Sequence, residues 1–114
     1  MLKLIFISFF LILAFLSCQN VNTADSFNYE RDTPAWLKAK IDTMTTGKLY
    51  VRTKVFRYEM NDEYIYYISI PLSSCVYCEV YYQSGKKLNF KDEKVLYDFE
   101  HKKKNEILIW ERKD

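Results

Sequence analysis

The sequence predicts an α+β fold, in which one N-terminal amphipathic helix packs on an antiparallel meander sheet of four to five strands. Apolar residues recur at helical spacing after Thr33, and from Leu49 onward the apolar periodicity changes to two. Short turn-forming sequences separate the later segments, so neighbouring strands are expected to pair antiparallel. A helix followed by such strands is expected to lie across one face of the sheet.

The helix is expected to begin at Thr33-Pro34, because threonine is a good N-cap and proline loses no hydrogen bond in the first helical position. The apolar residues that follow share one helical face, and they are Trp36, Leu37, Ile41 and Met44. Thr46-Gly47 offers a place for the helix to end. About three helical turns are therefore expected.

Several later segments are rich in the strand formers Val, Ile, Tyr and Phe. These segments are residues 49–60, 64–72, 76–82, 87–90 and 107–111. Asn61-Asp62-Glu63 is a good hairpin turn between the first two, and residues 83–86 form the next turn. The strand at 64–72 is apolar on both faces, so it is expected in the centre of the sheet. Either the segment 91–105, as a short helix or a loop, or a partner is expected to cover its second face.

The N-terminus has the layout of a secretory signal. Lys3 supplies a positive charge, a thirteen-residue apolar segment interrupted only by Ser8 fills positions 4–16, and the small residue Ser17 follows. A helix of that length reaches about 20 Å, which is less than the roughly 30 Å hydrocarbon core of a bilayer. Residues 1–17 are therefore predicted to be a signal peptide and not a permanent span.

Cys18 directly follows that small residue, and the arrangement resembles the lipobox of bacterial lipoproteins. The usual lipobox has Leu and then a small residue before the Ser, Gly or Ala, whereas Phe15 and Leu16 fill those places here. The resemblance implies that the Cys18 thiol is acylated and becomes the first residue of the mature chain. An ordinary cleaved signal is the alternative.

Residues 18–32 are polar and lack apolar periodicity, so they are predicted to form a flexible tether between the membrane and a single domain at 33–114. The default location is the cell envelope, on the outer membrane facing the periplasm or on the cell surface. Seventeen basic and fifteen acidic residues leave a net charge of only +2. This balance argues against a nucleic-acid partner, as does export.

The domain also resembles a family of small, uncharacterised Bacteroidota lipoproteins. The similar segments are residues 33–41, 55–60, 64–68 and 74–81 and the late pair Ile109-Trp110. Some relatives have adjacent cysteines where this chain has Cys75 and Cys78, and they continue into a glycine-rich segment that this chain lacks. The resemblance implies a lipoprotein and assigns no catalytic activity.

Cys75-Val76-Tyr77-Cys78 is the one motif with the potential for chemistry. Its spacing matches thiol-disulfide oxidoreductases, whose reactive thiol is acidified by a helix that starts directly after it, but strand-forming residues follow here. Zinc needs more ligands than two thiols, and His101 is the only histidine that could join them. A local disulfide between the two cysteines uses every cysteine that lipidation of Cys18 leaves over. Disulfide, redox and metal roles all remain open at this point.

Nine of the ten tyrosines lie between Tyr50 and Tyr97, mostly on predicted strands. They fill the core of a small domain, or they form a recognition face. The candidate binding surface consists of Tyr64, Tyr66, Tyr67, Tyr81 and Tyr82. The sequence thus predicts a lipid-anchored module that binds a protein partner in the envelope without catalysis, cofactor or metal. An inhibitor-like role is a narrower version of this prediction, and a redox or metal protein using Cys75 and Cys78 is the alternative.

Overall fold

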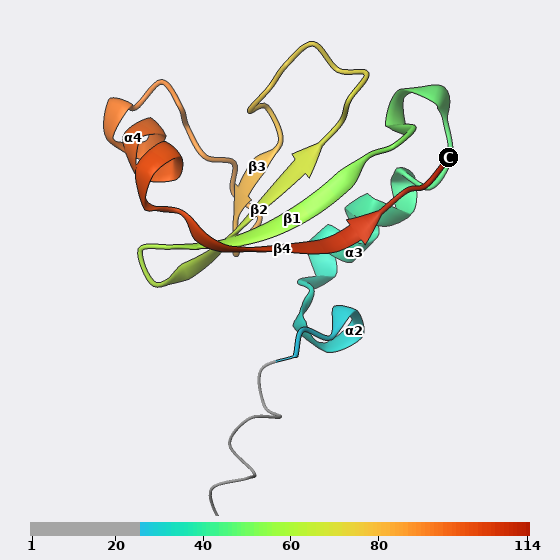
Figure 1. Ribbon diagram of the computed structural model, residues 1–114, viewed down its shortest axis with the longest axis horizontal. Coiled ribbons are helices and arrows are strands. Elements are labelled where there is room, and N and C mark those ends of the chain that lie inside the picture. The colour runs from blue at the N-terminus through green and yellow to red at the C-terminus, as the bar shows by residue number, and fades with distance from the viewer. Residues whose placement is uncertain (1–25) are drawn as a thin grey trace, which may run out of the picture.

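Four antiparallel strands form one sheet in the order β3-β2-β1-β4 in the computed structural model, which describes residues 26–114 (Figure 1). The strands are β1 (Lys54–Met60), β2 (Glu63–Ser69), β3 (Val80–Tyr82) and β4 (Lys104–Glu111). The hairpin between β1 and β2 turns at Asn61 and Asp62, which both have positive φ, as a type I′ turn requires. The predicted α+β class and the antiparallel sheet are confirmed.

One face of the sheet packs against α3 (Ala35–Thr43), which lies beneath the strands in Figure 1. Leu37 and Ile41 on this helix are buried. They belong to a first core cluster with Met44, Val55, Tyr66, Ile68, Tyr81 and Ile109. The helix begins one residue after Pro34, so the proline stands just before the first turn and leaves no backbone N–H unpaired there.

The opposite face of the sheet packs against α4 (Glu93–Lys102). The segment 91–105 therefore contains a helix, and this helix covers the second face of β2. Asp92 caps this helix, because its side chain accepts a hydrogen bond from Lys94 N at 3.0 Å. The second core cluster consists of Tyr58, Met60, Ile65, Val80, Leu88 and Phe99. Strand β2 contributes to both clusters, as its apolar residues on both faces predict.

Three of the strands are shorter than the sequence predicts, and one of them, β2, ends at Ser69 instead of Leu72. A 3-10 turn at Lys48–Tyr50 and the positive φ of Arg52 delay the start of β1 to Lys54. Strand β3 begins only at Val80, because the preceding residues fold into a closed loop. Residues 87–90 form no strand of their own, and only Lys87 bridges to Tyr81.

The packed part of the chain begins before Thr33, where the tether was predicted to end. Tyr29–Asp32 form the single turn α2, and Phe27 and Tyr29 pack against the first core cluster. The predicted tether is therefore corrected for these residues, since Phe27 and Tyr29 are partly buried against the first core cluster. The signal peptide and Cys18 lie outside the described residues. Among residues 26–114, no helix combines the length and the apolar character needed to cross a bilayer.

Candidate functional site

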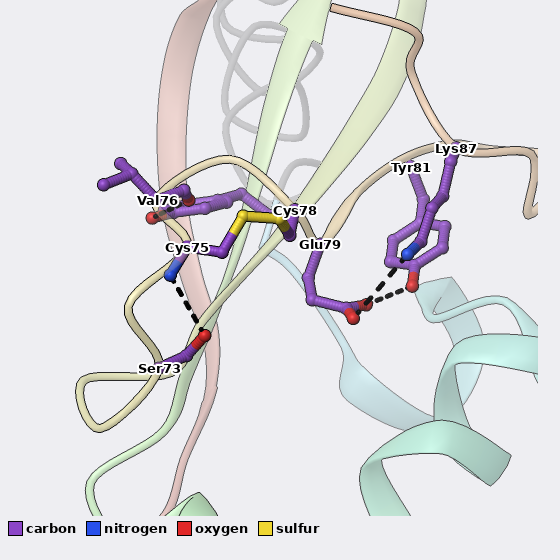
Figure 2. The surroundings of a disulfide bond; sticks show 8 residues. Ser73, Cys75, Val76, Cys78, Glu79, Tyr81 and Lys87 are labelled. Carbon is purple, nitrogen blue, oxygen red and sulfur yellow. Dashed lines mark hydrogen bonds and ion pairs between the residues drawn. A yellow bond between two sulfur atoms is a disulfide. The ribbon is translucent and has the colours of Figure 1, made fainter.

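Residues 70–79 form a loop between β2 and β3, which we call the disulfide loop. It projects from the end of the sheet opposite to α2 (Figure 1). Figure 2 shows Cys75 and Cys78 joined by a disulfide bond, with Cα atoms 5.7 Å apart. Three residues of extended strand would span roughly 10 Å, so the bond is incompatible with a strand through these positions. This is why β3 starts after the second cysteine.

The disulfide loop exposes apolar side chains that the strand pattern did not single out. Leu72 is 62% exposed, Val76 is 67% exposed and Tyr77 is 37% exposed. Ser73 helps to hold the turn, because its hydroxyl accepts from Cys75 N at 3.3 Å (Figure 2). The only sequence signal for this loop was the pair of cysteines, whose disulfide closes a turn that leaves Val76 exposed.

Tyr77 lies between the two disulfide-bonded cysteines and packs the disulfide loop against the second core cluster. Its ring centroid is 5.1 Å from that of Phe99, 5.7 Å from Phe90 and 5.9 Å from Tyr67. Tyr67 also donates its hydroxyl to Val76 O at 3.3 Å. The base of the loop is thus packed on aromatic rings, while its tip carries exposed Leu72 and Val76.

Glu79 ties the far end of the loop to the rest of the domain (Figure 2). Its carboxylate accepts a hydrogen bond from the Tyr81 hydroxyl. The same carboxylate lies 3.7 Å from Lys40 Nζ on α3 and 3.8 Å from Lys87 Nζ. Burial, and then the hydrogen bond to Glu79, raise the pKa of Tyr81 to about 12. The Glu79 carboxylate beside Cys78 therefore already interacts with the hydroxyl of Tyr81 and the ammonium groups of two lysines.

The surroundings of the two cysteines differ from those of a catalytic dithiol. The residues after Cys78 enter strand β3, so no helix starts directly after the second cysteine as it does in a thiol-disulfide oxidoreductase. His101 lies on α4, where its ring stacks on Tyr97 with centroids 4.3 Å apart. Within residues 26–114 there is no group of three histidine, cysteine or carboxylate side chains placed to hold a metal ion.

The five tyrosines predicted as a binding surface do not form one exposed face. Tyr66 is 1% exposed and Tyr81 is 5% exposed, so both belong to the core, and this part of the prediction is corrected. Their rings contact Trp36 at centroid distances of 6.0 Å and 5.3 Å. The other three are half-buried, and they are Tyr64, Tyr67 and Tyr82. Because β2 is covered on both faces, alternation along it does not separate recognition residues from core residues.

Comparison with known proteins finds no matching family model, no matching curated protein and no matching solved structure.

Proposed function

We propose that this protein is a lipid-anchored module of the bacterial cell envelope that binds a partner protein through the disulfide loop and catalyses no reaction. The observation that carries the proposal is the exposure of Leu72 and Val76 at the tip of a loop whose base is packed and covalently closed. Exposed apolar side chains gain free energy when a partner covers them. A closed loop loses little conformational entropy on binding, which favours affinity.

The direction of the loop supports a protein partner in preference to the anchoring bilayer. The chain enters the domain beside α2, and the disulfide loop lies at the opposite end of the sheet (Figure 1). A lipid on Cys18 would hold the α2 end of the domain toward the membrane. The loop then faces the aqueous side of the envelope, where proteins are the available apolar partners.

The anchor is tested by intact-mass spectrometry of the full chain extracted from the membranes of a bacterium that expresses it. The expected mass corresponds to a chain that begins at Cys18 and carries acyl groups. The Cys18→Ser variant should leave the membrane fraction. An unmodified chain that begins at another residue would refute the anchor.

The binding surface is tested by placing a photo-crosslinking amino acid at Val76 in living cells. The control position is Tyr97, which is 56% exposed and lies on α4, outside the disulfide loop. A discrete protein adduct is expected at position 76 and not at 97, and Leu72→Glu should abolish it. Equal crosslinking at both positions, or none at either, would argue against the disulfide loop as the interface.

The second candidate function is thiol-disulfide exchange, which the exposure of both cysteines favours. In that reaction a thiol reductant first opens the Cys75–Cys78 disulfide, and the Cys75 thiolate attacks a substrate disulfide, forms a mixed disulfide and releases one substrate thiolate. The Cys78 thiolate then attacks the Cys75 sulfur, which releases the second substrate thiolate and forms the Cys75–Cys78 disulfide again. Cys78→Ser would trap that mixed disulfide, visible as a reducible adduct on a non-reducing gel. The binding function predicts no such adduct. The Cys75→Ser/Cys78→Ser double variant is the negative control, because it cannot form a mixed disulfide at these positions.

A further inference from the structure

A second surface feature, separate from the disulfide loop, is a hollow of about 360 Å³ between α2 and the sheet. It is lined by Ser26, Phe27, Arg31, Asp32, Arg57, Tyr64 and Gln83. Arg57 on β1 and Tyr64 on β2 belong to the same sheet face as α3, beyond the area that the helix covers. Hollows of this size accommodate small ligands.

The guanidinium group of Arg57 is held between two aromatic rings. Its central carbon lies 4.0 Å from the ring centroid of Tyr64 and 4.9 Å from that of Phe27. Cation–π contacts of this kind fix the plane of the guanidinium group and leave its edge free for hydrogen bonds. No carboxylate or carbonyl within residues 26–114 accepts a hydrogen bond from Arg57 or forms an ion pair with it. The group is therefore oriented but unoccupied by any described residue.

The other charges of the hollow are already matched. Arg31 donates from Nε and one terminal nitrogen to the two oxygens of Asp32, at 2.8 Å and 2.9 Å. This pairing holds the pKa of Asp32 low, at about 2, so the carboxylate stays ionised. One positive charge of the pair thus cancels one negative charge. The excess charge of the hollow is the one on Arg57.

An adjoining hollow of about 260 Å³ carries the opposite charge. Three carboxylates line it, from Glu59, Asp62 and Glu63. The two hollows share Tyr64 and Gln83, so they form a continuous surface with a positive and a negative part. A phosphate dianion would meet repulsion from these carboxylates. A ligand with a carboxylate at one end and an ammonium group at the other would complement both parts.

We propose that the paired hollows bind a short zwitterionic peptide, whose carboxylate forms a bidentate hydrogen-bonded pair with Arg57 while its ammonium group faces Glu59, Asp62 and Glu63. The planar fork of arginine matches a carboxylate better than the point charge of lysine does. This site goes beyond the proposed function, because it shares no residue with the disulfide loop.

Trp36 provides a local reporter for binding. Its indole Nε1 donates to Gln83 O at 2.9 Å, and Gln83 lines both hollows. The chain has only two tryptophans, so Trp110→Phe leaves Trp36 as the single fluorophore. The experiment titrates this full chain, in detergent micelles, with trialanine, trialanine amide, N-acetyl-trialanine and inorganic phosphate while Trp36 fluorescence is recorded.

Saturable binding of trialanine is expected, with affinity at least tenfold weaker for the C-terminal amide and measurably weaker for the acetylated peptide. Arg57→Gln should weaken trialanine binding at least tenfold, and Arg57→Lys should recover only part of the loss. The matched control is Lys54→Gln, which removes one exposed positive charge from the same strand and should leave binding unchanged.

Three comparisons of affinity would each overturn the site. They are equal affinity for trialanine and its amide, equal effects of Arg57→Gln and Lys54→Gln, and phosphate binding that is tighter than that of trialanine. Absence of a saturable response to trialanine counts against it equally. The comparison of acid with amide needs no variant at Arg57, so it decides the matter even where Arg57→Gln fails to fold. Crosslinking at Val76 is unaffected by any of these outcomes, which keeps the two proposals separate.

Discussion

The indole ring of Trp36 lies directly over Gly85, so close that a methyl group added to the glycine would stand 3.3 Å from two indole carbons. Gly85 has a φ of +94°, in the left-handed region that side chains disfavour. The same indole donates its N–H to Gln83 O in that turn. Helix α3 and the turn after β3 are therefore fastened together at a point where only glycine fits.

Gly85→Ala should lower the free energy of unfolding by about 2 kcal/mol or more, because backbone strain and contact with Trp36 add together. Gly47→Ala is the matched control. Its φ is +91°, but an added methyl would stand 3.8 Å from its nearest neighbour, Tyr50, and so would meet no steric conflict. Urea unfolding of both variants measures the difference. Equal losses would show that strain alone acts and that the Trp36 contact costs nothing.

Phe99→Ala should destabilise the domain by about 3–5 kcal/mol, as buried aromatic truncations do. Phe99 is 1% exposed, and its ring meets Tyr58, Tyr67, Tyr77 and Phe90. Lys103 Nζ also lies 4.1 Å from its ring centroid. The exposed Tyr97→Ala on the same helix should change stability by no more than about 0.5 kcal/mol, apart from helix propensity. Similar losses in the two variants would mean that α4 does not pack through Phe99.

Stability should fall in alkaline solution, and the raised pKa of Tyr81 should account for part of the fall. The folded pKa is raised to about 12, while an unfolded tyrosine titrates near 10. Above about pH 10 the unfolded chain releases this proton and the folded chain keeps it, so unfolding becomes more favourable until about pH 12. Tyr81→Phe should flatten this part of the pH profile measured by urea unfolding, whereas Tyr97→Phe should not. An unchanged slope in Tyr81→Phe would contradict the assignment.

Asp98 links α4 to the β1–β2 turn, and the stability that this link contributes should depend on the negative charge of its carboxylate. Asn61 Nδ2 donates to one Asp98 oxygen at 3.1 Å, and Lys102 Nζ lies 3.2 Å from the other. The hydrogen bond from Asn61, followed by the one from Lys102, lowers the pKa of Asp98. Asp98→Asn should therefore reduce stability at neutral pH.

The difference between Asp98→Asn and the natural chain should shrink in acid, because the natural carboxylate is itself neutralised as the pH falls through its lowered pKa. The comparison uses thermal unfolding at several pH values. Glu100→Gln removes an exposed carboxylate from the same helix and should have little effect at any pH. A constant difference across the acid range would mean that the charge on Asp98 plays no part.

Local sequence patterns determined the α+β class, the β1–β2 hairpin and the central place of β2. Asn61 and Asp62 tolerate positive φ, so they form the turn whatever the strands pack against. The apolar residues on both faces of β2 require cover on both sides, whatever elements provide it. These features depend on a residue and its near neighbours, which is why the sequence alone predicts them.

Only the tertiary structure decided which side chains are available for binding. Tyr66 and Tyr67 are adjacent and chemically identical, yet the first is buried against Trp36 and the second is half-buried beside Tyr77. Arg57 acquires the orientation of its guanidinium from Phe27 and Tyr64, which lie elsewhere in the chain, and no residue of 26–114 forms an ion pair with it. Burial and charge pairing are sums over neighbours that are distant in sequence, so no local pattern records them.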